Sequence, residues 1–253
     1  MVFRTRTVVT GVVAAGSLVM ATLAAAVVLS AGPVQAATRA DAGSGTPDAA
    51  TLYHDALATT HAWSVHYSSD STQSKQTLLE SGDAGPASGS QTVSMGKGSI
   101  TIVLIGDITY VKGNPDGLET LVGLSSSQAG VVANQWIEFS TTNSVFSQVV
   151  AGVRSTDVAH ELALKGPLSL VHAKTIDGTS VDAIEGTQTF GHTTDHVVLY
   201  VRAHGSHVPV EEDSVNTKGQ RTSAEHIAYS KWGETVRPRA PQAAVSIGPV
   251  SSV

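Results

Sequence analysis

The stretch GKGSITIVLIGDITYVKGN, residues 96–114, predicts the centre of the fold. Residues 100–105 are all β-branched or aliphatic, and residues 108–111 (ITYV) form a second run of the same kind. Gly106-Asp107 separates the two runs, and glycine accepts the positive φ that a two-residue hairpin turn demands. We therefore expect the central hairpin of an antiparallel sheet here.

Side chains alternate between the two faces of a strand, so residues two apart share a face. Ile102 and Leu104 share one face of the first strand, and Ile108 and Tyr110 share one face of the second. These four side chains are the first candidates for an apolar interior.

The N-terminal residues 1–36 are predicted to be a signal peptide. Arg4 and Arg6 precede an almost wholly apolar segment of about 20 residues, and Val34-Gln35-Ala36 resembles a small-x-small cleavage site. An apolar segment of this length also reaches across a bilayer, so an uncleaved leader that anchors the protein to the membrane is the alternative.

Composition excludes several function classes. The 253-residue chain has 0 cysteines, which removes disulfides, thiolate catalysis, thiolate zinc sites and the lipidated cysteine of bacterial lipoproteins. Its formal net charge is −6 and it has no cluster of Lys or Arg, so we expect no binding to nucleic acid. No catalytic motif is complete, and no cofactor is predicted.

Hydrophobic periodicity divides the rest of the chain into alternating helical and strand blocks. We expect a helix from Thr46 (N-cap) to about Thr59, and then a strand block that ends with the central hairpin. The block starts with a strand that has Trp63, Val65 and Tyr67 on its buried face, and residues 81–90 form a loop within it. Asn114-Pro115-Asp116 is predicted to start a helical block, and five strands follow Gly166. The expected later elements are helices starting near Ser125, Asn143 or Ser144, and Ser155, a short strand at 134–139, and strands at 169–176, 179–189, 194–203, 208–216 and 223–232.

Two strand blocks separated by helices predict one antiparallel sheet whose concave face the helices cover. An interior that side chains do not fill would be a ligand cavity. The predicted organisation is a signal peptide (1–36), a linker (37–45), a single domain (46–237) and a flexible Pro- and Ala-rich tail (238–253).

The chain resembles a known group of exported proteins over most of residues 46–241. The resemblance lies in an N-terminal helix, the hairpin segment GDITYVKGN (106–114), the segment NQWIEF (134–139) and the closing segment KWGETV (231–236). The sequence is similar to actinobacterial exported proteins related to the mycobacterial lipid-carrying lipoproteins, and more remotely to proteins of the LolA/LolB lipoprotein-carrier fold.

This resemblance implies an α+β fold in which a strongly curved antiparallel sheet, an incomplete β-barrel, covers a helical plug and leaves an apolar cavity for acyl chains. It brings no catalytic residues. The cavity-lining residues that it implies are Ile102, Leu104, Ile108, Tyr110, Leu118, Leu121, Trp136, Phe146 and Val149. The lipidated cysteine of many relatives is missing, which favours a free carrier or one held by an uncleaved leader.

Three functions are therefore weighed. The leading hypothesis is a non-enzymatic carrier or binder of a lipid or other apolar molecule in the cell envelope, outside the cytoplasm. The second is an envelope interaction module with a packed core, no ligand and an unknown protein partner. The third is a metal-dependent enzyme or metal store that uses His192, His196, His204 and His207; because no third ligand stands at a recognised spacing, exposed histidines near turns are the preferred interpretation.

Overall fold

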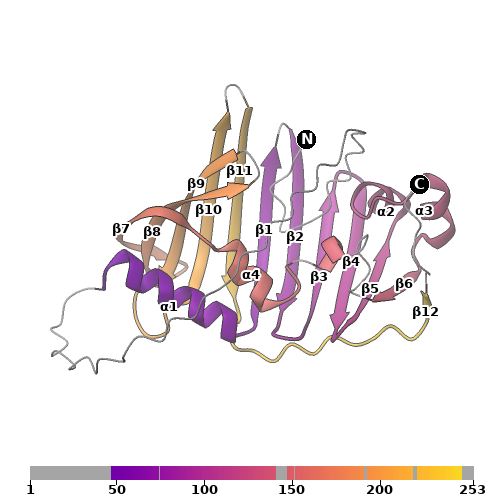
Figure 1. Cartoon of the computed structure of the whole chain (residues 1–253), viewed down its shortest axis with the longest axis horizontal. Helices are drawn as coiled ribbons and strands as arrows, with labels where there is room; N and C mark the ends of the chain where they lie inside the picture. Colours follow the sequence, from indigo (N-terminus) through magenta and orange to yellow (C-terminus); the bar gives the residue numbers. More distant parts are fainter. Residues whose placement is uncertain are drawn as a thin grey trace, which may run out of the picture.

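The structure is a computed structural model that describes residues 47–73, 75–140, 147–150, 152–190, 193–218 and 221–246. Within these residues, twelve strands form one sheet and four α-helices lie against it (Figure 1). The elements are α1 (Ala49–Ala62), β1 (Val65–Gln73), β2 (Gln76–Ala84), β3 (Ser88–Met95), β4 (Gly98–Ile105), β5 (Ile108–Gly113), α2 (Pro115–Thr120), α3 (Ser126–Val132), β6 (Trp136–Ser140), the 3₁₀ helix η1 (Ser147–Val150), α4 (Ser155–Glu161), β7 (Lys165–Ile176), β8 (Thr179–Phe190), β9 (Thr193–Arg202), β10 (Pro209–Lys218), β11 (Arg221–Ser230) and β12 (Ala244–Ser246).

The predicted central hairpin is present as β4 and β5. Ile105 pairs with Ile108, and the two-residue turn between them contains Gly106 at φ +59°. The same register pairs Ile102 with Val111 and therefore places these two side chains on one face of the sheet.

The strand order is β12-β6-β5-β4-β3-β2-β1-β11-β10-β9-β8-β7, so β1 to β6 and β7 to β11 are each a meander of consecutive strands. Neighbours are antiparallel, except that β12 runs parallel to β6. The sheet is open and curved, and its helices lie on one face, with α1 and α4 over one half and α2 and α3 over the other (Figure 1). The fold class is thus α+β with an open curved sheet, as predicted.

The core beneath the sheet is divided into two apolar clusters. The first, which we call the β4 cluster, contains Leu78, Val93, Ile100, Ile102, Leu104, Val111, Leu118, Leu121, Val122, Leu124, Ala129, Ile137, Val149 and Val153. The second, the α1 cluster, contains Ala49, Leu52, Tyr53, Ala56, Val65, Tyr67, Ala84, Val158, Leu162, Ile184, Leu199, Val201, Ile227 and Tyr229. Each cluster joins one half of the sheet to its own helices, so the two halves have separate interiors.

Helix starts agree with the sequence except at the first helix. Asn114 caps α2 through Gly117 N–H at 2.7 Å, and Ser125 caps α3 in a capping box with Gln128. The cap of α1 is Asp48, whose carboxylate accepts from Thr51 N–H at 2.7 Å, and the helix runs to Ala62. The sequence predicted Thr46 as the cap, with Pro47 at the first helical position and Asp48 in the first turn. The cap lies two residues later, since Pro47 also fits the position before a cap.

Two strand predictions are wrong. Residues 81–90, expected to be a loop, continue the sheet: β2 runs to Ala84 and β3 starts at Ser88. The glycines that suggested a loop allow close packing instead, since a Cβ on Gly82 would lie 2.8 Å from the Tyr67 hydroxyl oxygen. Trp63, expected on the buried face of β1, is the C-cap of α1 and 40% exposed.

The C-terminal segment is also more structured than predicted. After β11 the chain crosses the sheet along one end of its strands (Figure 1), and Ala244–Ser246 then pairs with β6 as β12. Trp232 Nε1 donates to Pro209 O at 2.8 Å, and Gly233 N–H donates to Ser64 O at 2.9 Å. These contacts fix the first part of the segment.

Some predictions fall outside the described residues. They are the signal peptide and linker (residues 1–45), the cap of the helix expected at Asn143 or Ser144, and the end of the tail beyond Ser246. In the part of the chain that the structure describes, no helix is both long and apolar enough to cross a membrane.

Candidate ligand-binding site

Five of the nine predicted cavity residues meet in the β4 cluster, on the inner face of the sheet. They are Ile102, Leu104, Leu118, Leu121 and Val149, and each is at most 2% exposed. Ile102 and Leu104 lie on β4, Leu118 and Leu121 on α2 and at its C-terminal end, and Val149 on η1. Only the fold brings these three elements together.

The other four do not join them. Tyr110 pairs with Val103, and Ile108 pairs with Ile105, so both lie on the outer face of the sheet, away from Ile102. Ile108 is 41% exposed, whereas Tyr110 is buried. Trp136 is half-buried on β6 beside β12, and Phe146 lies outside the described residues.

The inner face of the β4 cluster is tightly enclosed. Ile102, Leu104 and Leu118 are 0% exposed, so no water-sized void touches their side chains. A ligand chain that binds among them must therefore displace the groups that cover this face.

A buried polar zone that was not predicted from the sequence lies between the two apolar clusters. Its members are inward-facing residues of the five central strands β3, β2, β1, β11 and β10 that are at most 7% exposed. They are Tyr67, Ser69, Ser71, Glu80, Gln91, Glu212, Ser214, Glu225 and Tyr229.

The register places these side chains in adjacent rows. Glu80, Ser69, Ile227 and Glu212 form one row across four strands, and Ser71, Glu225 and Ser214 form the next row. Within the zone, Ser69 Oγ donates to Glu225 Oε1 at 3.0 Å, and the Tyr229 hydroxyl donates to Glu212 Oε2 at 3.4 Å.

Gln91 stands at the edge of the polar zone, on β3. It faces inward because it pairs with Ile102, and it is 1% exposed. Among the described residues, neither its Nε2 nor its Oε1 has a hydrogen-bond partner. A buried amide without partners costs about 1–3 kcal/mol, so it is an exception that calls for an explanation.

One signal in the sequence points to this zone. On β1, Ser69 and Ser71 continue the inward parity of Val65 and Tyr67, and Glu80 has the parity of Leu78 on β2. Polar residues at positions where the alternation calls for apolar ones indicate either that the strand extends beyond the core or that a buried polar site is present. Only the burial of these side chains distinguishes the two.

A run of three carboxylates such as Glu211-Glu212-Asp213 usually forms a solvated face, but its middle residue is buried. The run lies on β10 between two paired strands, so alternate side chains point to opposite faces. Glu212 is 3% exposed on the inner face, whereas Asp213 points outward and bonds His226 Nδ1 at 2.8 Å.

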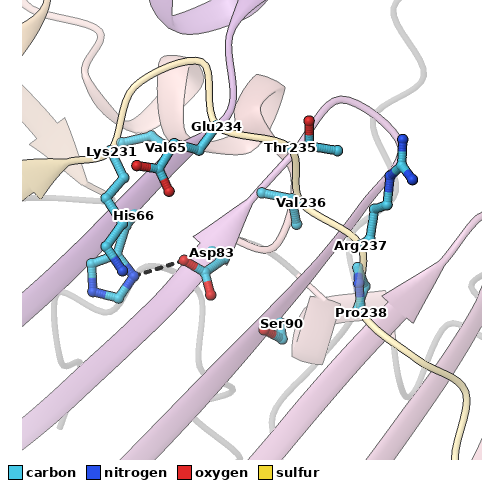
Figure 2. A pocket seen from close by; sticks show the side chains of 10 residues that line it. All are labelled: Val65, His66, Asp83, Ser90, Lys231, Glu234, Thr235, Val236, Arg237 and Pro238. Carbon is cyan, nitrogen blue, oxygen red and sulfur yellow. Dashed lines mark hydrogen bonds and ion pairs between the residues drawn. The ribbon is translucent and has the colours of Figure 1, made fainter.

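A surface pocket of about 280 Å³ lies where the C-terminal segment crosses β1 and β2 (Figure 2). His66 Nδ1 and Asp83 Oδ1 are 2.7 Å apart on its floor. Its lining is mixed in charge and includes Lys231, Arg237, Asp83 and Glu234. This pocket is on the outer face of the sheet and is not the predicted acyl cavity.

The structure does not bring the described histidines of the candidate metal cluster together. His196 lies near the start of β9, whereas His204 and His207 follow its end, about 20 Å further along the strand. His207 Nδ1 lies 3.0 Å from Arg202 O. Over the described residues, no group of three or more His, Asp or Glu side chains is placed to hold a metal ion; His192 lies outside them.

The described chain is thus an α+β protein built on one open curved sheet, with two apolar clusters and a buried polar zone on its inner face. No family model and no curated protein matches the chain.

Solved structures that it resembles include LprF from Mycobacterium bovis, at 12% identity, with 78% of this chain and 99% of that chain covered and a TM-score of 0.49. They also include the Mycobacterium tuberculosis lipoprotein LppX, at 18% identity over 75% of this chain and 97% of that chain, with a TM-score of 0.44. A LolA superfamily protein from Nitrosomonas europaea has 12% identity over 76% and 96%, with a TM-score of 0.29.

Proposed function

We propose that this chain is an exported, non-enzymatic binder or carrier of a lipid or other apolar molecule in the cell envelope. The observation that carries the proposal is the β4 cluster: aliphatic side chains of the sheet's inner face meet there under α2, α3 and η1, none of which exceeds seven residues. Helices this short have little stability of their own and can be displaced at low cost.

The energetic basis is transfer of hydrocarbon from water into this interior. Each buried CH₂ group contributes about 0.8 kcal/mol, so a sixteen-carbon chain contributes roughly 10 kcal/mol before the costs of binding and of displacing the covering groups. The leader proposed at residues 1–36 would direct the protein out of the cytoplasm, cleaved or retained as an anchor.

Native mass spectrometry of protein purified from its own host tests the proposal, with a co-purified apolar ligand as the expected result. Delipidated protein should then be stabilised by added lipid, by about 2.7 kcal/mol when the free lipid is at a hundred times its Kd. Absence of any ligand, together with no stabilisation by lipids of any chain length, would refute the proposal.

A matched pair of variants locates the site. Leu104→Ala enlarges the β4 cluster from inside, so it should shift binding toward longer or branched chains. Ile105→Ala removes a similar volume from the neighbouring residue on the outer face and should leave the chain-length preference unchanged. Equal effects of the two variants would place the ligand elsewhere.

The alternative function is an envelope interaction module without a ligand. It is favoured by the complete enclosure of Ile102, Leu104 and Leu118, which is what a packed core shows. Crosslinking in the native host should then recover a protein partner, and the delipidated protein should show no lipid-dependent change in stability.

A further inference from the structure

A second candidate site lies on the outer face of the sheet, away from the apolar interior. It is the pocket of about 280 Å³ that the C-terminal segment forms with β1, β2 and β3 (Figure 2). Residues 231–238 of this segment, which we call the C-terminal strap, form one wall of the pocket. The proposed function uses the opposite face of the sheet, so a ligand of this pocket would be independent of it.

The floor of the pocket is a row of three polar side chains on neighbouring strands. His66 pairs with Asp83, and Asp83 pairs with Ser90. His66 Nδ1 lies 2.7 Å from Asp83 Oδ1, whereas Asp83 Oδ2 accepts no hydrogen bond from another described residue. The floor therefore offers a carboxylate oxygen and a hydroxyl group to a ligand.

Hydrogen bonds hold the C-terminal strap over this floor. Gly233 N–H donates to Ser64 O at 2.9 Å, and the Ser64 hydroxyl donates to Glu234 O, beside the start of β1. Ser88 Oγ donates to Val236 O at 3.5 Å, at the start of β3. The strap is thus attached on both sides of the pocket, so the pocket exists before a ligand binds and little ordering is needed on binding.

Three charged side chains of the strap line the pocket without internal partners. Lys231, Glu234 and Arg237 are exposed, and none of them forms an ion pair with another described residue. Their charges are therefore available to a ligand.

The charges are also separated along the pocket. Lys231 follows the register partner of His66, and Glu234 N–H donates to Lys231 O at 3.3 Å, so both residues lie at the end that holds His66 and Asp83. Figure 2 shows the Arg237 side chain at the other end of the pocket. With His66 neutral, the first end has one negative charge in excess, and the second end is positive.

This distribution fits a small zwitterion. An ammonium group binds the carboxylates of Asp83 and Glu234, and a carboxylate binds the guanidinium of Arg237, whose planar fork matches it. A phosphate would lie close to the two carboxylates, and an acyl chain would meet mostly polar side chains. The volume corresponds to about nine water molecules at ~30 Å³ each, so a ligand of roughly ten non-hydrogen atoms fits.

We propose that this pocket binds a small zwitterion of the amino-acid class, with its ammonium group at Asp83 and Glu234 and its carboxylate at Arg237. The class includes free amino acids and short peptides whose two termini are both free. The inference goes beyond the proposed function and gives the C-terminal strap a role in binding.

The test compares three probes of nearly equal size: the dipeptide alanylalanine, its N-acetyl derivative and its C-terminal amide. The derivatives lack the ammonium and the carboxylate, respectively. Binding to the full chain is followed by the amide chemical shifts of Ser90 and Val236, at low ionic strength and about pH 7, where the α-amino group is protonated. We expect the dipeptide to bind about fivefold or more tightly than either derivative.

Substitutions at the two ends of the pocket test the orientation of the ligand. Glu234→Gln should weaken binding of the dipeptide about three- to tenfold and leave the N-acetyl derivative unchanged, and Arg237→Gln should do the same with the amide unchanged. Both side chains are exposed, so neither substitution threatens the fold. Arg239→Gln is the matched control, because Arg239 is an exposed arginine of the same segment that does not line the pocket, and it should leave all three affinities unchanged.

Three results would overturn the inference: equal binding of the three probes, binding of none of them, or equal losses in the Arg237 and Arg239 variants. The last result would show a general effect of charge and no site at this pocket. Each of them leaves the proposed function standing, because that function concerns an apolar ligand on the inner face of the sheet.

Discussion

Replacement of Gln91 by leucine should stabilise the ligand-free protein. The side chain is 1% exposed and lies beside the β4 cluster, and neither amide atom has a hydrogen-bond partner among the described residues. Leucine has nearly the same volume and no polar atoms, so the substitution removes the desolvation penalty of the amide. We expect the free energy of unfolding to rise by about 1–3 kcal/mol.

For a domain of this size, each kcal/mol shifts Tm by roughly 2–4 °C, so the expected rise is about 2–12 °C. Urea unfolding of delipidated protein, followed by tryptophan fluorescence and by circular dichroism, measures the change in free energy and tests for a single transition. Gln76→Leu makes the same substitution at an exposed position at the start of β2 and should stay within about 0.5 kcal/mol of the wild type.

A lower stability of Gln91→Leu would refute this reasoning. The amide would then be satisfied within the ligand-free protein, and Gln91 would be a structural residue. A higher stability is the result that the unpaired amide predicts.

Three further perturbations test the fold. Tyr53→Phe removes the hydroxyl that bonds Leu162 O at 3.2 Å and Leu164 N–H at 2.6 Å, and should cost about 1–3 kcal/mol in urea unfolding; unchanged stability would show that these bonds are replaced by water. Gly82→Ala places a Cβ 2.6 Å from Ser90 O and should cost about 1–3 kcal/mol in urea unfolding by overpacking the sheet; unchanged stability would show that the strands move apart here to admit the methyl group. The bond from Thr51 N–H lowers the pKa of Asp48, so its contribution to stability is present above the unfolded-state pKa and is lost as the pH falls through the lower folded-state value; Asp48→Ala should abolish this part of the pH dependence of Tm, and an unchanged pH profile would contradict the capping role.

Local signals predicted the hairpin and most helix starts correctly. The Gly106 turn, the Asn114 cap and the Ser125 cap each depend on contacts within a few residues, so the sequence contains the whole cause. The parity of Ile102 and Leu104 was predicted for the same reason, because alternation along a strand is a local property.

Predictions that needed partners from elsewhere in the chain failed. Tyr110 was expected beside Ile102, but the register of β4 and β5 places it on the opposite face, and the length of the turn sets that register. The segment 81–90 was expected to be a loop, because its glycines suggest a turn. In the structure Gly82 is instead needed for the close approach of the Tyr67 side chain, which comes from the neighbouring strand. The C-terminal segment was expected to be unstructured, because β12 forms only when β6 offers an edge.

The sequence by itself determined the α+β class, the order of helical and strand blocks and the absence of thiol chemistry, since these follow from local periodicity and composition. Tertiary structure alone decided that the core is split in two and that Glu80, Glu212 and Gln91 are buried between its parts. The reason is that burial depends on which strands become neighbours: β1 pairs with β11, more than 150 residues away, and this pairing closes the polar zone.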